Sequence, residues 1–234
     1  MIETTMNNIP FFENAASDVY SLLLSMVLLG LYHLYLAYKI RKRPTYTIQA
    51  VNRIARTAWV ETIMQERRDI LAVQTLRNST MAATFLASTA VLLIIGVLTL
   101  SGQGANLSTT WHALNMVGTP HESLWLAKLM LLLCDLFVVF FCFSMSIRMF
   151  NHVGFMINVP LALNHKMISP QHVALHLNRA GKFYSIGMRA FYFLVPLVFW
   201  LFGPHFMIAS TILLIFVLYF LDRAPKVMAD DYAE

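Results

Sequence analysis

Four long apolar stretches constrain this chain more than any other feature. They cover about residues 18–38, 81–100, 124–147 and 190–221, and the second contains no charged side chain. A helix needs about 20 mostly apolar residues to cross the hydrocarbon core of a bilayer. Only 12% of the whole chain is charged, about half the usual share in soluble domains. The sequence therefore predicts an all-α polytopic integral membrane protein with about four transmembrane helices.

The fourth stretch is too long for one upright helix. It holds no Asp, Glu, Lys or Arg, and as a single helix it would measure about 48 Å against a hydrocarbon core of about 30 Å. Pro196 and the pair Gly203-Pro204 interrupt it, and each proline removes a backbone donor. The stretch is therefore kinked or broken. We predict one kinked span, which puts the C-terminus outside; the alternative is a hairpin of two shorter helices around Gly203-Pro204.

The basic residues alternate between the connections. Residues 1–17 and 101–123 contain no Lys or Arg, whereas residues 39–80 contain nine and residues 148–189 contain five. Because Lys and Arg are retained on the cytoplasmic side, both basic connections are predicted to be cytoplasmic. The sequence thus predicts one membrane domain over residues 1–234, multi-pass in a plasma (bacterial inner) membrane, with the N-terminus outside.

The first cytoplasmic connection has the pattern of an amphipathic basic helix. Apolar residues recur at steps of three and four between Val51 and Leu76, with arginines among them. Two interpretations stay open. Residues 39–77 lie on the bilayer and bind anionic lipids, or the helix packs on its neighbours and its arginines only follow the cytoplasmic bias. Because that bias also explains the net charge of +5, no nucleic-acid partner is predicted.

The second cytoplasmic connection carries a helix start signal. Ser169 can cap a helix, Pro170 suits its first position, and Gly181 predicts its end. His172 and His176 are four residues apart and therefore share one face of this second amphipathic helix. They are the candidate metal ligands, but one pair does not complete a site. We predict polar histidines at the interface, no metal and no cofactor.

Asp135 is the costliest residue in the apolar stretches. An ionised carboxylate near mid-membrane costs at least about 2.5 kcal/mol on insertion scales, so Asp135 should be protonated, paired or in contact with water. Lys128 stands seven residues earlier on the same helical face, from which its side chain can reach the outer interface. Two interpretations stay open for Asp135: a place on a functional pathway, or a hydrogen bond that holds helices together.

The second apolar stretch has a face of small residues. Ser79, Ala83, Ala87 and Ala90 recur at helical spacing, and Thr84 and Ser88 lie beside them. Small faces allow helix backbones to approach closely, so this helix is predicted to be central in the bundle or in an oligomer. A pore lining would show the same residues, and Thr84 and Ser88 therefore join Asp135 and Lys128 as pathway candidates.

Three segments carry a family resemblance. AVQTLRNSTMAATFLASTA (residues 72–90), NHVGFMINVP (151–160) and RAGKFYSIGMRAFYFLVPLVFWLFGP (179–204) resemble the bacterial and plant membrane proteins known as domain of unknown function 599, DUF599. The resemblance spans roughly residues 20–222. It implies a multi-span membrane protein without an established activity, and it supplies no catalytic residues. It marks motif positions that the predicted topology places near the cytoplasmic membrane face: Arg77, Asn78, Asn151, His152 and Arg189.

Three classes of function fit the sequence to different degrees. A small homo-oligomeric ion channel or transporter fits Asp135, the small polar helix and the broken fourth stretch. The alternative is a non-catalytic accessory or assembly subunit of a larger membrane complex. An enzyme fits least, because no catalytic constellation, histidine-box set or Gly-rich phosphate loop occurs. We predict the channel or transporter.

Overall fold

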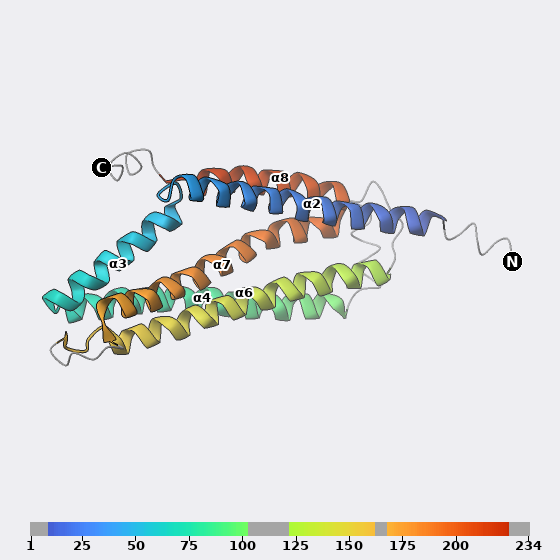
Figure 1. Cartoon of the computed structure of the whole chain (residues 1–234). Coiled ribbons are helices and arrows are strands. Elements are labelled where there is room, and N and C mark those ends of the chain that lie inside the picture. Colours follow the sequence, from blue (N-terminus) through green and yellow to red (C-terminus); the bar gives the residue numbers. More distant parts are fainter. Residues whose placement is uncertain (1–8, 103–121, 162–167, 225–234) are drawn as a thin grey trace. The chain divides into compact units, whose positions relative to one another are not determined.

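The computed structural model describes residues 9–102, 122–161 and 168–224, and every regular element in them is a helix. The all-α prediction is confirmed. The helices, shown in Figure 1, are α2 (Ile9–Lys42), α3 (Ile48–Glu66), α4 (Asp69–Ser101), α6 (Glu122–Met156), α7 (Pro170–Phe202) and α8 (Pro204–Leu221).

Five of the helices are long and apolar enough to cross a membrane. The candidate spans are Ala16–Lys42, Asp69–Ser101, Leu124–Met156, Pro170–Phe202 and Pro204–Leu221. The prediction of a multi-pass membrane protein is confirmed at this level, and the count of about four spans is wrong by one. The extra span arises because the stretch over residues 190–221 is divided between α7 and α8.

Gly203 separates α7 from α8. Its φ of 150° is a backbone conformation that residues with a side chain rarely adopt. Pro204 follows as the first residue of α8, where its missing N–H costs nothing. Pro196, by contrast, is accommodated inside α7. The break therefore falls at the glycine-proline pair.

Helix α8 runs beside α2 and in the same direction (Figure 1). The Ser21 hydroxyl contacts the Met207 sulfur at 4.0 Å, and the Thr211 hydroxyl donates to Ser25 Oγ at 3.1 Å. Residue numbers rise together along the two helices, so the helices are parallel. The prediction of a single kinked span is therefore wrong, and the hairpin alternative is right.

The segments that follow α2 and α8 pair with each other. The Ile48 N–H donates to the Asp222 carbonyl at 3.2 Å, and the Ala224 N–H donates to the Tyr46 carbonyl at 3.1 Å. The described chain therefore ends beside the connection that follows α2. A single kinked span would have put this segment on the opposite side; residues 225–234 themselves lie outside the described residues.

The chain divides into two compact units. Unit 1 comprises Met1–Lys39, Leu92–Leu136 and Phe191–Leu221, and unit 2 comprises Ile40–Val91, Phe137–Ala190 and Asp222–Glu234. The single membrane domain over residues 1–234 stays a prediction.

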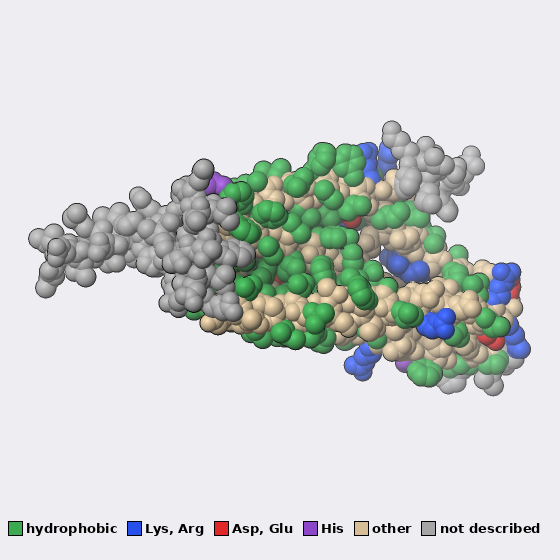
Figure 2. Space-filling view, turned by 180° about the vertical axis from the view of Figure 1, so that it is seen from behind, with side chains coloured by type: hydrophobic (Ala, Val, Ile, Leu, Met, Phe, Trp, Pro, Cys, Tyr) green, Lys and Arg blue, Asp and Glu red, His purple; other side chains and the backbone are tan. Residues whose placement is uncertain are grey.

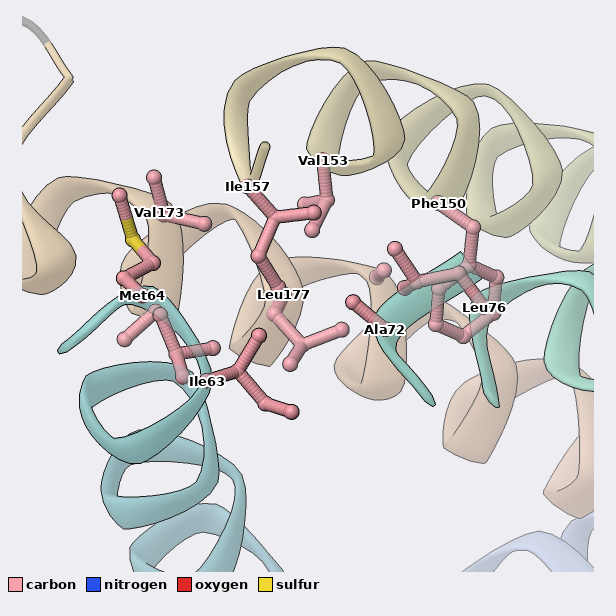
Figure 3. Close-up of a cluster of buried hydrophobic side chains, with 12 residues drawn as sticks. Ile63, Met64, Ala72, Leu76, Phe150, Val153, Ile157, Val173 and Leu177 are labelled. Carbon is pink, nitrogen blue, oxygen red and sulfur yellow. The ribbon is translucent and has the colours of Figure 1, made fainter. Parts of the chain in front are cut away.

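The core of unit 2 joins α3 to α4, α6 and α7 (Figure 3). Ile63 and Met64 of α3 point toward side chains of the three longer helices, among them Leu177. The buried cluster consists of Val60, Ile63, Met64, Ala72, Leu76, Phe150, Val153, Ile157, Val173, Ala174, Leu177 and Ala180. The apolar face of α3 is therefore used for packing, which favours the second interpretation of its amphipathic pattern.

The start of α7 is as predicted, but its end is not. The His172 N–H donates to Ser169 Oγ at 3.3 Å, which confirms the cap. Gly181 does not end the helix, which continues to Phe202. A Cβ at Gly181 would lie 2.7 Å from the guanidinium carbon of Arg56. The glycine therefore leaves room for the end of the Arg56 side chain, and it does not end the helix.

The surface of the spans is apolar, as helices in contact with lipid require. Figure 2 shows hydrophobic side chains over much of the visible face. Large residues such as Phe85, Leu92 and Leu34 are exposed. Cys134 is also exposed, whereas Cys142 is buried.

We predict that an impermeant maleimide applied to intact cells labels Ser108→Cys but neither Gln65→Cys nor Tyr232→Cys. Each cysteine is introduced singly into a variant in which Cys134 and Cys142 have been replaced. The α2–α8 pairing puts the chain after α8 on the side of α3, while Ser108 and Tyr232 themselves lie outside the described residues. Permeabilised cells provide the control. Labelling of Tyr232→Cys without Gln65→Cys would contradict the hairpin.

Helix α4 generates a second prediction. Ala83 and Ala87 are buried, whereas Thr84 beside them is exposed. Ala83→Leu and Ala87→Leu should each destabilise the protein by about 1–3 kcal/mol, because a packed contact does not admit the added volume. Ala82→Leu makes the same change at an exposed position of α4; it is the matched control and should change stability little. Unfolding in detergent micelles measures the effect, and equal stabilities for all three variants would show that the alanine face is not packed.

Candidate functional site

Unit 1 contains a buried ion pair between helices α2 and α6. Asp18 and Lys128 are each only 8% exposed, and Lys128 Nζ lies 2.9 Å from Asp18 Oδ1. The indole N–H of Trp200, on α7, donates to the same Oδ1 atom at 3.0 Å. Lys128 Nζ also lies 5.2 Å from the centre of the Trp200 ring. Three helices are therefore held together by one carboxylate, one ammonium and one indole.

The helix break supplies a further acceptor for Lys128. In an unbroken helix the Trp200 carbonyl would accept from the residue four positions later, but that residue is Pro204, which has no N–H. The carbonyl accepts instead from the Gly203 N–H at 3.2 Å and from Lys128 Nζ at 3.2 Å. The break at Gly203-Pro204 thus creates part of the lysine site.

The ion pair changes the expectation for Lys128. The sequence allowed its side chain to reach the outer interface, but the ammonium is buried, because Asp18 and the Trp200 carbonyl satisfy it. The backbone carbonyl of Asp18 also accepts a hydrogen bond from the Ser21 hydroxyl at 2.8 Å, within the same helix. This cluster of Asp18, Lys128 and Trp200 is called the charge cluster below.

Asp135 also belongs to unit 1 but lies outside the charge cluster. Its Oδ2 atom is buried and has no hydrogen-bond partner among the described residues. Leu132 and Leu136 beside it belong to the buried core of unit 1. No serine or threonine of the described chain donates to Oδ2, so this atom does not form the hydrogen bond between helices that was one of the two interpretations of Asp135.

Thr84 and Ser88 are exposed on α4. The Thr84 hydroxyl donates to the Thr80 carbonyl at 2.9 Å within its own helix. The two side chains belong to unit 2, whereas Asp135 and Lys128 belong to unit 1. Their place on a common pathway stays a prediction.

Arg189 is the motif residue with the most definite role. Its Nη2 atom lies 2.9 Å from Asp222 Oδ1, and Asp222 is buried. The Asp222 carbonyl in turn accepts from the Ile48 N–H. Arg189 therefore anchors the segment that follows α8 to α7, inside unit 2.

The other motif residues lie on helix surfaces. Arg77 and Asn78 are exposed on α4, and Asn151 and His152 are exposed on α6. The His152 ring lies 5.1 Å from the ring of His176, centre to centre. The structure thus brings His152 beside His176, one of the two candidate metal ligands.

The three histidines form a ring cluster in unit 2. His172 Nε2 and His176 Nε2 are 3.1 Å apart, which fits a hydrogen bond between one protonated and one unprotonated nitrogen. His176 Nδ1 is buried and has no partner in the described part of the chain. Among the described residues, no group of three or more His, Cys, Asp or Glu side chains could hold a metal ion.

A second polar contact joins α3 to α7. Arg56 Nε donates to Asn178 Oδ1 at 2.9 Å, and Asn178 Nδ2 donates to the Thr57 hydroxyl at 3.1 Å. Burial lowers the pKa of Arg56, but a guanidinium remains protonated at any physiological pH. These bonds fix α3 on the face of α7 where Gly181 makes room.

Sequence reasoning missed Asp18, Trp200 and Asp222. Asp18 lies at the start of the first apolar stretch and was interpreted only as the boundary of that stretch. One signal was available for it: a lone lysine inside another stretch needs an acidic partner, and few acids lie in or beside the spans. No sequence signal pointed to the Trp200 carbonyl, since its acceptor role depends on where α7 ends.

The apolar helices and the charges buried between them define the class: a multi-pass helical membrane protein. The chain belongs to the family described as Protein of unknown function, DUF599, whose model matches residues 20–227. This confirms the predicted family and covers every described helix from within α2 to the end of α8. Comparison with curated proteins and comparison with solved structures found no match.

We predict that Asp18→Asn and Lys128→Met each destabilise the protein by about 3–5 kcal/mol, because each leaves a buried charge without its partner. The double variant should lose much less than the sum, as coupled sites do. Unfolding in micelles measures all three. Arg68→Gln is the control, since it breaks the exposed pair with Glu66, worth about 1 kcal/mol at most. Additive single effects would show that Asp18 and Lys128 do not interact.

Proposed function

We propose that this protein is a small ion channel or transporter with Asp135 on its path. The observation that carries the proposal is the buried Oδ2 atom of Asp135, which has no partner among the described residues. A carboxylate oxygen removed from water costs free energy unless a proton, a cation or a water molecule satisfies it. Ionisable residues inside spans commonly belong to ion or proton pathways.

The charge cluster supports a cation as the transported species. Lys128 stands seven residues before Asp135, about 10 Å along α6. An unpaired ammonium at that distance would oppose a cation at Asp135, but Asp18 neutralises it. A single carboxylate whose surroundings carry no net charge can bind a proton or a small monovalent cation. The ion class we propose is therefore a proton or an alkali cation.

We also propose a plasma (bacterial inner) membrane, with the N-terminus outside and α3 in the cytoplasm. The support is the absence of Lys and Arg from residues 1–17 and 101–123 and their number in residues 39–80. In this orientation the segment after α8 is cytoplasmic too, because it pairs with the segment after α2.

A homo-oligomer is part of the proposal. Thr84 and Ser88 are exposed and four residues apart on α4, a helix whose neighbouring exposed residues include Phe85. Hydroxyl side chains are common at helix–helix contacts in membranes, where they bond across helices. A second copy of the chain at this face would cover both hydroxyls. It would also place α4 in the interface.

A second candidate is a non-catalytic accessory or assembly subunit of a larger membrane complex. The observation that favours it is the exposure of large aromatic side chains on α6, including Phe137 and Phe141. Aromatic side chains are enriched among the residues that supply most of the binding energy at protein–protein interfaces. Reconstitution separates the candidates, because a channel or transporter conducts when purified alone and an accessory subunit does not.

The test of the proposed function is flux in proteoliposomes. Asp135→Asn keeps the size of the side chain and removes its charge, so it should insert and assemble normally. We expect flux to fall about ten-fold or more, which corresponds to about 1.4 kcal/mol at the barrier. Asp69→Asn makes the same change at an exposed position at the start of α4 and should leave flux unchanged.

Two results would contradict this assignment. Wild-type flux in Asp135→Asn, together with failed assembly of Asp135→Leu, would make Asp135 a packing residue. Absence of proton and alkali-cation flux from purified wild-type protein would favour the accessory subunit.

A further inference from the structure

Unit 2 has a strong excess of positive charge. Its described residues include thirteen Lys and Arg but only four Asp and Glu. Several of the basic groups are already engaged inside the protein: Arg56 with Asn178, Arg68 with Glu66 and Arg189 with Asp222. The others include Arg77, Arg148, Arg179 and Lys182, which are all exposed.

Three helices expose a basic residue between large apolar ones on the same face. On α4, Arg77 stands between Ile70, which is 77% exposed, and Met81, which is 62% exposed. The spacings of seven and four residues put these three side chains in one row.

The other two helices repeat this arrangement. On α6, Arg148 stands seven residues from both Phe141 and Phe155, which is 79% exposed. On α7, Arg179 and Lys182 stand between the exposed residues Leu175 and Ile186 at spacings of four, three and four. Figure 2 shows Lys and Arg side chains beside hydrophobic ones on the surface.

Each of the three arginines lies beside the buried cluster of unit 2. Leu76, Phe150 and Ala180 are within two residues of Arg77, Arg148 and Arg179, respectively, and belong to one buried cluster. Figure 3 shows Leu76 and Phe150 side by side in that cluster. The three arginines therefore stand on helices that share this cluster, each within two residues of one of its members.

These basic groups have no internal counter-charge. In the described part of the chain, Arg77, Arg148, Arg179 and Lys182 form no ion pair, although each is exposed. Guanidinium groups bind phosphate oxygens through two parallel hydrogen bonds. The exposed apolar residues on both sides of each basic group favour contact with lipid acyl chains over contact with water.

We propose that Arg77, Arg148, Arg179 and Lys182 form a binding collar for anionic phospholipids. The phosphate headgroups bind the basic side chains, and the acyl chains lie along exposed residues such as Met81, Phe141 and Ile186. Charge complementarity and the mixed apolar rows both select an anionic lipid over a soluble acidic partner. The collar goes beyond the proposed ion path and does not depend on it, since it uses other residues.

The experiment measures lipid binding to the detergent-solubilised full chain. Phosphatidylglycerol and phosphatidylcholine of equal chain length are titrated, and bound lipid is counted by native mass spectrometry. We expect phosphatidylglycerol to bind tighter. Arg77→Gln, Arg148→Gln and Arg179→Gln should each weaken its binding about five-fold, the equivalent of about 1 kcal/mol per basic residue at a membrane surface. Each matching Arg→Lys variant should retain more binding than its Gln variant.

Arg53→Gln is the matched control, because Arg53 is exposed on α3 and outside the collar. It should change binding by about two-fold at most, as a screened distant charge does. Thermal unfolding without anionic lipid should be equal in all variants, which separates lost binding from lost folding. Equal affinity for the two lipids, or equal losses in Arg53→Gln and the collar variants, would overturn the proposal. So would glycerol phosphate binding as tightly as the lipid, since that indicates a site for soluble phosphate.

Discussion

The ion pair between Asp18 and Lys128 is the interaction on which the arrangement of unit 1 depends. Each charge alone would be costly inside a bilayer, and together they are satisfied by one another, by the Trp200 indole and by the Trp200 carbonyl. That carbonyl is available because Pro204 cannot donate to it. The end of α7, the start of α8 and the burial of Lys128 are thus consequences of the same local chemistry.

The hairpin then determines where the rest of the chain can lie. Because α8 runs parallel to α2, the residues that follow both helices meet, and backbone bonds join Tyr46 and Ile48 to the segment after α8. Within unit 2, Arg189 fixes Asp222, and the apolar face of α3 is buried on α4, α6 and α7. Two backbone hydrogen bonds, one ion pair and one apolar cluster therefore organise unit 2.

Sequence reasoning predicted the features that depend on local composition. It missed the features that depend on contacts between residues far apart in the sequence. The apolar stretches, the cap at Ser169 and the packed alanines of α4 follow from length, capping chemistry and side-chain size. The hairpin was only an alternative, because hydropathy is the same for a kinked span and a turn. Gly181 looked like a helix end, since its approach to Arg56 involves a residue 125 positions away. Of the candidate site, Asp135 and Lys128 were found, but not Asp18.

Two carboxylates of unit 1 show why Asp135, and not the charge cluster, is the better candidate for a path. Asp18 Oδ1 already accepts from an ammonium and an indole, both fixed by their helices. An ion bound at Asp18 would have to displace both the Lys128 ammonium and the Trp200 indole. It would have to offset the loss of both contacts, and it would leave the buried Lys128 without a counter-charge. Asp135 Oδ2 has no donor among the described residues, so a proton or cation there breaks no contact of that atom. The free energy of ion binding therefore favours the unsatisfied carboxylate, while the satisfied one holds the helices that surround it.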